Sequence, residues 1–312
     1  MRRRDIENIL HQAGARPRHR LGQHFMIDPR VLRAILDAAD LHGDDVVLEV
    51  GPGPGNLTAL LSEKAGTVLA VDIDSALLAA AAQHWNHLKN VQWLRADVLA
   101  GKHEINPAVT QALLTLLERT ERNGRRHRRG KLVANLPYNV ASPLVAELLL
   151  LHWRNRHDSA PGGLLFERLV FTVQREVALR MRATAGTAAY GALGIIIQLL
   201  GDVEILRMIA PESFWPPPQV HSALVLIRPN EAKMAALSDA VGMQRILAGL
   251  FAHRRQNLVN AIRHGFPSVQ IIPLLSRLQA SGIDPRERAE NLAPEQLLLL
   301  CEMLPAGDSR WG

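Results

Sequence analysis

Short apolar runs alternate with amphipathic segments through most of the first 229 residues of this 312-residue chain. Each run has the length of a buried strand, and the segments between them place apolar residues at helical spacing. Such an alternation predicts a parallel sheet covered by helices, which is an α/β fold. We expect strands at residues 46–50, 68–72, 91–94, 132–135 and 169–173, with 193–200 and 223–227 as later strands.

After Pro229 the pattern changes, because only helical periodicity continues from Glu231 to Leu304. This change predicts a domain boundary, with an α/β domain in residues 1–229 and a small all-helical domain in residues 230–312. No internal repeat interrupts either part.

Composition narrows the class of protein. Cys301 is the only cysteine, so the sequence offers neither a disulfide framework nor a cysteine-based metal cluster. The apolar runs are too short to cross a bilayer. We therefore expect a cytoplasmic protein without a metal or a membrane segment.

The net charge of +6 is concentrated in three clusters. The first is an N-terminal arm rich in arginine, and the third is the pair Arg254 and Arg255. The second runs from residue 119 to residue 131, and contains Arg119, Arg122, Arg125, Arg126, Arg128, Arg129 and Lys131. Each cluster alone could be a solvated face, but three together favour a phosphate-rich partner such as RNA.

The stretch "VVLEVGPGPGNLTALL" carries the first chemical motif. A strand leads into Gly51, Gly53 and Gly55, where the lack of side chains lets the backbone approach a ligand at the carboxyl edge of the sheet. The spacing differs from the usual dinucleotide motif, and a tight turn without a ligand is the alternative.

The next two expected strands end in acids. Asp72, in "VDID", follows the glycines by about one βαβ unit, where a carboxylate can accept hydrogen bonds from both hydroxyls of a ribose. Asp97, in "RADVL", can accept from an adenine amino group. A dinucleotide oxidoreductase would share the glycines and the first acid, and Asp72 could also be a solvated acid at a strand end.

The fourth expected strand ends in "NLPY", residues 135–138, and this motif distinguishes the possibilities. The amino group of adenine is a poor nucleophile because its lone pair is delocalised into the ring. The Asn135 side-chain oxygen and the Leu136 carbonyl could accept its two hydrogens and localise the lone pair, while Pro137 turns that carbonyl outward. Tyr138 offers a face on which an extruded base can stack. The alternative is an ordinary strand-to-helix turn.

Two further positions carry unusual residues. Phe214 and Trp215 precede three prolines, which suggests either a base contact for Phe214 or a packed domain corner. His24 has no partner at metal-ligand spacing, so a hydrogen-bonding or stacking role is expected.

An ordered series of motifs along the chain resembles the KsgA-type ribosomal RNA small-subunit adenine N6,N6-dimethyltransferases. The series runs "RHRLGQHFMID", "LEVGPGPGNLT", "VDID", "NLPYNVASP", "TVQREVALRM", "AAYGALGI", "APESFWPPPQVHSALV", "HRRQNLVNAI" and "GIDPRERAENL". The resemblance implies a Rossmann-like domain that uses S-adenosyl-L-methionine. It also implies transfer of two methyl groups to N6 of each of two adjacent adenosines near the 3′ end of 16S rRNA, by direct in-line transfer.

The resemblance also assigns roles to residues. His24 and Met26 match positions that close over the cofactor, Gly51 and Gly53 the loop beside its methionine part, Asp72 the ribose acid and Asp97 the adenine contact. Asn135 matches the residue between cofactor and target base, and Phe214 an aromatic that sandwiches the base with Tyr138. The implied partner is small-subunit rRNA in an immature 30S particle, bound by a monomer.

Two departures and two alternatives accompany this resemblance. Ala192 and Gly194 replace a usual arginine and serine, and the stretch between Asp97 and Asn135 is longer than in the family because it contains the arginine cluster. An Erm-like enzyme would methylate an adenine of the large subunit instead. A protein that binds RNA mainly as an assembly or transcription factor would keep the fold without relying on catalysis.

Overall fold

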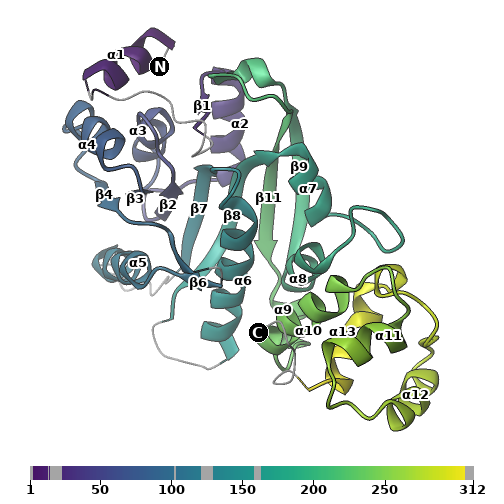
Figure 1. The fold of residues 1–312 in the computed structure, drawn as a ribbon. Helices are drawn as coiled ribbons and strands as arrows, with labels where there is room; N and C mark the ends of the chain where they lie inside the picture. Colours follow the sequence, from purple (N-terminus) through teal and green to yellow (C-terminus); the bar gives the residue numbers. More distant parts are fainter. Residues whose placement is uncertain are drawn as a thin grey trace. The chain divides into compact units, whose positions relative to one another are not determined.

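The computed structural model describes residues 3–12, 14, 23–101, 103–120, 129–157 and 163–305. The chain forms two compact units (Figure 1). The first comprises Met1–Ala178 and Val203–Pro229, and the second Leu179–Asp202 and Asn230–Gly312. These units differ from the division expected at residue 229 only in residues 179–202, which pack with the C-terminal helices. The arginines Arg125, Arg126 and Arg128 lie outside the described residues.

A seven-stranded sheet forms the centre of the first unit, in the order β4-β3-β2-β7-β8-β11-β9. Strands β4, β3, β2, β7 and β8 are parallel, whereas β11 runs antiparallel to β8. The expected α/β sheet is thus confirmed as mostly parallel, whereas the antiparallel direction of β11 and the presence of β9 were not predicted. Its strands are β2 (Val46–Val50), β3 (Thr67–Asp72), β4 (Val91–Arg95), β7 (Arg129–Asn135), β8 (Leu165–Gln174), β9 (Gly201–Ile209) and β11 (Ser222–Pro229).

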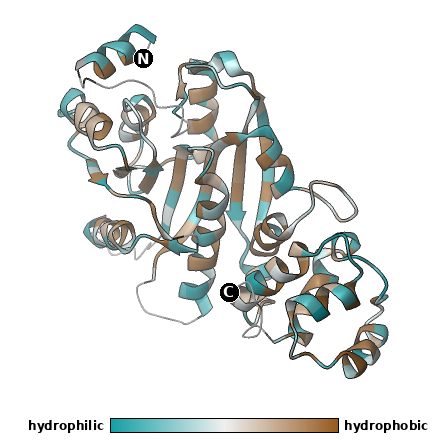
Figure 2. Ribbon diagram, in the orientation of Figure 1, coloured by the Kyte–Doolittle hydropathy of each residue, from teal (hydrophilic) through white to brown (hydrophobic). Residues whose placement is uncertain are grey.

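Helices and short elements connect these strands. Every residue of β2 is buried, as expected of a central strand with helices on both faces. Figure 2 shows hydrophobic residues concentrated in the sheet. The connecting elements are α1 (Arg3–Gln12), β1 (Phe25–Met26), α2 (Pro29–Ala39), α3 (Asn56–Ser62), α4 (Ser75–His84), β5 (Leu99–Gly101), β6 (Glu104–Ile105), α5 (Pro107–Thr120), α6 (Ala141–His157), α7 (Arg175–Met181), η3 (Pro211–Ser213) and β10 (Phe214–Trp215).

The prediction of a strand at residues 193–200 was wrong, because these residues form helix α8 (Ala192–Leu200). The run "GIIIQLL" is apolar on nearly all sides, so its periodicity does not separate a buried helix from a buried strand. Gln198 donates to the carbonyls of Met181 and Ala183, over 3.1 and 3.0 Å. A Cβ at Gly194 would lie 2.2 Å from the Arg180 carbonyl oxygen, so this close approach requires glycine.

The second unit is helical beyond Asn230, as the sequence predicted. Tyr190 is buried, donates from its hydroxyl to the Leu292 carbonyl over 2.9 Å, and meets Phe251 edge-on at 6.0 Å. No helix among the described residues is long and apolar enough to cross a membrane. The remaining elements are α9 (Glu231–Ala235), α10 (Ala240–Ala252), α11 (Leu258–Gly265), α12 (Ile271–Ala280), η4 (Ala289–Asn291) and α13 (Pro294–Met303).

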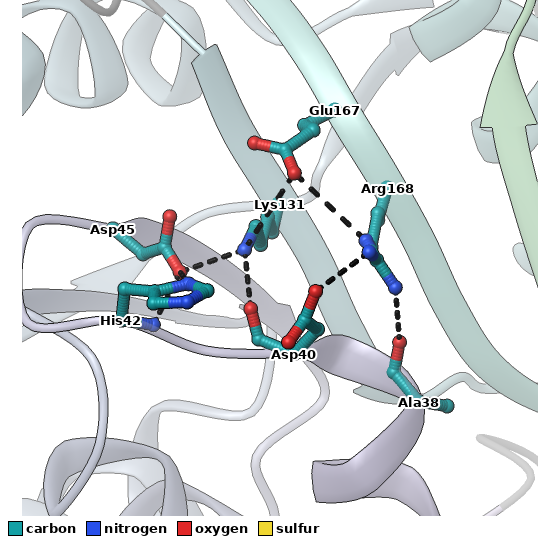
Figure 3. Close-up of polar contacts among 7 residues, drawn as sticks. All are labelled: Ala38, Asp40, His42, Asp45, Lys131, Glu167 and Arg168. Atoms are coloured by element: carbon teal, nitrogen blue, oxygen red, sulfur yellow. Dashed lines mark hydrogen bonds and ion pairs between the residues drawn. The ribbon is translucent and has the colours of Figure 1, made fainter.

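A polar network lies at the amino ends of β7 and β8 (Figure 3). Lys131 Nζ donates to Asp45 Oδ2 over 2.8 Å and to the Asp40 carbonyl over 2.7 Å, although Lys131 is only 1% exposed. Arg168 donates to Asp40 Oδ2 over 2.7 Å and to the Ala38 carbonyl over 3.2 Å. Since Asp40 ends α2 and Asp45 precedes β2, the network ties this end of α2 to the sheet. The expectation that Lys131 belongs to a partner-binding cluster was wrong, because its charge is used inside the protein.

Replacing Lys131 by methionine should lower the free energy of unfolding by roughly 3 kcal/mol, because Asp45 would keep a poorly hydrated charge without its partner. Urea denaturation of Lys131→Met measures this loss. Lys64→Met is the matched control, because Lys64 is exposed and its replacement should change stability by no more than about 0.5 kcal/mol. Equal stabilities of the two variants would contradict the structural role of Lys131.

Candidate active site

The carboxyl ends of β2, β3, β4 and β7 surround a pocket. Parallel strands place their carboxyl ends at the same edge of a sheet, where α/β proteins bind ligands. The described residues that line the pocket are Gln23, His24, Phe25, Gly51, Gly53, Asp72, Ile73, Leu77, Asp97, Asn135, Pro137, Asn139 and Val140. The glycine loop, both strand-end acids and the NLPY motif therefore meet at one cavity.

The glycine loop between β2 and α3 has no room for side chains. Gly51, Gly53 and Gly55 adopt φ angles of 70°, 58° and 86°, which favour glycine over other residues. A Cβ at Gly51 would lie 3.1 Å from the Pro137 ring, and one at Gly53 would lie 2.8 Å from the Phe25 ring. Two segments distant in sequence thus pack directly on the loop.

Trp85, the C-cap of α4, supports the same loop from another direction. Its Nε1 donates to the Pro54 carbonyl over 2.9 Å, and a Cβ at Gly55 would lie 2.6 Å from its ring. The loop conformation is therefore fixed by packing as well as by its own sequence.

Asp72 ends β3 and is 9% exposed. Burial raises the pKa of its carboxyl, and backbone N–H groups oppose this shift. One of them is the Asp74 N–H, which donates to Asp72 Oδ1 over 2.9 Å. A carboxylate that is held by backbone donors and faces a pocket is a suitable acceptor for hydroxyl groups of a ligand.

Glu49 lies behind the pocket on β2 and is 1% exposed. Burial raises its pKa to about 8, and the negative charge of Asp72 adds to this increase. One oxygen of Glu49, Oε2, has no hydrogen-bond partner among the described residues. The protonated form of this carboxyl is therefore favoured at neutral pH.

Asn135 ends β7 and faces the pocket, and its Nδ2 donates to the His24 carbonyl over 2.8 Å. Asp97 lies just beyond β4, where its Oδ1 accepts from the Leu99 N–H over 3.1 Å. Leu136 is buried beside Asn135. Strands β3, β4 and β7 thereby bring Asp72, Asp97 and Asn135 to the carboxyl edge of the sheet.

His24 connects three segments around the NLPY motif. Its ring stacks on that of Tyr138, with centroids 5.7 Å apart, and its Nδ1 is hydrogen-bonded to the Pro216 carbonyl oxygen over 2.8 Å. The Tyr138 hydroxyl is hydrogen-bonded to the Ser222 hydroxyl over 2.8 Å. Burial of the Tyr138 side chain raises the pKa of its hydroxyl. These contacts fix the orientation of the tyrosine ring beside the pocket.

Seven of the predicted site residues line the pocket, namely His24, Gly51, Gly53, Asp72, Asp97, Asn135 and Pro137. Met26, Leu136, Tyr138 and Phe214 are not among its described lining residues. Met26 is buried, and its carbonyl accepts from Asn56 Nδ2. Phe214 is 2% exposed and packs in a hydrophobic cluster with Met26, so the sandwich of a base between Phe214 and Tyr138 stays a prediction.

The sequence analysis did not assign roles to Phe25, Leu77 or Trp85. Phe25 and Leu77 belong to one hydrophobic cluster with Ile6 and Leu10 of α1, and both line the pocket. The only signal for Phe25 was its position inside the "GQHFMID" motif. Trp85 gave no signal, because its contact with the loop exists only in the folded chain.

Arg129 lies away from this pocket. Arg129 begins β7, whereas Asn135 ends it, so the strand separates them by about 20 Å at about 3.3 Å per residue. In the second unit Arg254 and Arg255 are exposed after α10. Arg254 Nη1 donates to the Ala188 carbonyl over 3.4 Å, and its Nε lies 3.8 Å from Glu290 Oε2. Their binding to RNA stays a prediction.

A family model described as ribosomal RNA adenine dimethylase matches residues 14–305. The chain belongs to this family. The resemblance found in the sequence is thereby confirmed. The pocket combines the glycine loop, Asp72 of "VDID" and residues of the NLPY motif, which are three of the motifs that carried the resemblance.

Proteins of similar sequence can be aligned with nearly the whole chain. A ribosomal RNA small subunit methyltransferase A of Rubrobacter xylanophilus is 38% identical over 290 residues, which cover 91% of this chain and 94% of the relative. A protein of the same name from Pelotomaculum thermopropionicum is 33% identical over 304 residues, covering 97% and 96%. The crystal structure of a dimethyladenosine transferase from Plasmodium falciparum shares the fold, with a TM-score of 0.67 and 24% identity over 92% of this chain and 99% of that chain.

The raised pKa of Glu49 predicts a pH-dependent stability. Between its unfolded value of 4.5 and its folded value of about 8, the folded chain binds the proton more tightly, so stability falls as pH rises through this window. Glu49→Gln should remove up to about 5 kcal/mol of that decline, since one pKa unit corresponds to about 1.4 kcal/mol. Urea denaturation of both proteins at pH 5 and pH 9 measures it. The same pH dependence in both proteins would show that Glu49 is not protonated in the folded state.

Proposed function

We propose that this chain transfers methyl groups from S-adenosyl-L-methionine to N6 of two adjacent adenosines near the 3′ end of small-subunit rRNA. The product is N6,N6-dimethyladenosine in a maturing small ribosomal subunit. The observation that carries the proposal is the single pocket in which the glycine loop, Asp72, Asp97 and Asn135 meet. The family and the names of the curated relatives support this choice of reaction and RNA.

The chemistry of the pocket suits S-adenosyl-L-methionine. Glycines without room for a Cβ form a cradle for an extended ligand, and the buried Asp72 carboxylate provides an acceptor for its ribose hydroxyls. The residues that would hold the cofactor are His24, Gly51, Gly53, Asp72, Asp97 and Asn135, all of which line the pocket, whereas Met26 is buried beside it.

The cofactor supplies a methyl group already activated by its attachment to a positively charged sulfur. The chain's own residues act on the adenine amine. Asn135 Oδ1 and the Leu136 carbonyl accept its two hydrogens, which localises the lone pair on nitrogen, and Pro137 keeps the Leu136 carbonyl out of the helix that follows. Alignment and lone-pair localisation therefore replace a covalent enzyme intermediate.

The adenine base would stack on Tyr138, whose ring orientation is fixed by Ser222 and His24. His24 already stacks on the Tyr138 ring, so the base would use the opposite face of the ring. Phe214 could complete a sandwich only if its side chain left the hydrophobic cluster that buries it here. We therefore assign the first stacking contact to Tyr138.

The proposed reaction is tested with labelled cofactor and three substrates: immature small subunits, naked rRNA and large subunits. Label should appear in N6,N6-dimethyladenosine from small subunits. Label in large-subunit adenine would favour the Erm-like alternative. RNA binding without transfer to any of the three substrates would favour a non-catalytic factor.

Two substitutions separate binding from chemistry in the same assay. Asp72→Ala should weaken cofactor binding by roughly 2–4 kcal/mol, since two ligand hydroxyls lose a charged acceptor. Asn135→Ala should abolish transfer and leave RNA affinity nearly unchanged. Calorimetry and filter binding measure the two affinities. Unchanged cofactor affinity in a folded Asp72→Ala variant would remove that assignment, and substantial dimethylation by Asn135→Ala would mean that another group activates the amine.

We propose that the helical C-terminal unit and the arginine cluster bind the phosphate backbone of the rRNA. Each lost phosphate contact should weaken binding and reduce the slope of log affinity against log salt by roughly one. The first variant carries Arg254→Ala and Arg255→Ala. The second carries alanine at all four of Arg125, Arg126, Arg128 and Arg129. Both should bind small-subunit RNA more weakly with unchanged cofactor affinity. A variant with the wild-type slope would exclude its cluster from the RNA surface.

A further inference from the structure

Thr172 lies next to Asn135 across the sheet and was not among the residues singled out by the sequence. β7 and β8 are adjacent parallel strands (Figure 1), and Asn135 is the register partner of Thr172. Thr172 is fully buried, and its Oγ1 donates a hydrogen bond to Asn135 Oδ1. The side chain that would activate the adenine amine thus has a direct contact to a neighbouring strand.

The two contacts of Asn135 determine which end of its amide carries the oxygen. The His24 carbonyl can only accept, so the amide end that faces it, 2.8 Å away, must be the NH₂ group. The other end is therefore the oxygen. The Thr172 hydroxyl can donate or accept, and beside this oxygen it donates.

Both ends of the amide are thus held, and by different elements. His24 belongs to the segment that leads into β1, whereas Thr172 belongs to β8. A carbonyl oxygen has two lone pairs, so Asn135 Oδ1 can accept from Thr172 and still accept from a second donor. Rotation of the amide away from the pocket would break both bonds.

The Thr172 hydroxyl lies in a stretch of strand whose neighbouring residues are apolar and buried. Phe171 and Val173 are fully buried apolar residues, and Val170 is also buried. A buried hydroxyl costs free energy unless it is hydrogen-bonded, and Asn135 Oδ1 provides that partner. Valine would fill the same volume in this strand without needing any partner.

We propose that Thr172 is a positioning residue for methyl transfer: its hydroxyl holds the Asn135 side-chain oxygen where it accepts a hydrogen of the adenine amine. This inference rests on the proposed function for its catalytic consequence. Thr172 does not touch the substrate, so its effect should appear in turnover and in the restraint of the Asn135 amide, not in cofactor affinity.

The test compares Thr172→Val, which removes the hydroxyl, with Thr172→Ser, which keeps it. Thr115→Val is the matched control, because the Thr115 hydroxyl donates to the Gln111 carbonyl of its own helix, α5, on the protein surface. Thr172→Val should lower kcat at least tenfold, with KM for cofactor and small subunits within twofold of wild type. Thr172→Ser should stay within threefold of the wild-type kcat, and Thr115→Val should match wild type.

A second readout does not depend on catalysis. The side-chain amide protons of Asn135, identified in NMR spectra by their loss in Asn135→Ala, should exchange with water at least tenfold faster in Thr172→Val than in wild type or Thr172→Ser. Should Thr172→Val fail to fold, Thr172→Ala takes its place with the same expected results.

Wild-type kcat in a folded Thr172→Val variant would overturn the proposal, as would unchanged exchange of the Asn135 amide. An equal loss of kcat in Thr172→Val and Thr172→Ser would also overturn it, because the hydroxyl would then not be the group that matters. Absence of transfer by the wild-type protein would instead refute the proposed function, and the amide exchange would still decide whether Thr172 holds Asn135.

Discussion

The site depends on a glycine loop that leaves no space for a side chain. Pro137, Phe25 and Trp85 pack against Gly51, Gly53 and Gly55, respectively, and each comes from a different part of the chain. Because a single Cβ would meet one of these side chains at about 3 Å or less, the three segments can pack this closely on the loop only where these positions are glycine. The same packing that shapes the loop therefore brings the NLPY motif and the N-terminal segment to the pocket.

The two edges of the sheet carry different kinds of polar contact. At the amino edge, Lys131 and Arg168 form ion pairs and hydrogen bonds that tie α2 to β2, β7 and β8 (Figure 3). At the carboxyl edge, Asn135 and Tyr138 are held by neutral hydrogen bonds.

The sheet was predictable because five of its strands are short, buried and separated by clear helical periodicity. The helix at residues 193–200 was not predictable, since uniformly apolar residues give no period and contacts such as that of Gly194 with the Arg180 carbonyl exist only in the folded chain. The strand-end residues Asp72 and Asn135 were also predictable, because their positions follow from where strands end. Contacts between residues 31 and 37 positions apart, such as Trp85 with Pro54 and Thr172 with Asn135, leave no local pattern. Lys131 was misassigned for the same reason, because its burial depends on Asp45.

The central claim is that the glycine loop, the segment before α2 and the NLPY motif form one cofactor site. Amide hydrogen exchange with and without S-adenosyl-L-methionine tests it most directly, followed by mass spectrometry of peptides that cover residues 23–27, 50–56 and 134–140. The account predicts that all three segments become protected together at the same cofactor concentration. Protection of the glycine loop alone, or protection confined to residues outside these three segments, would contradict it.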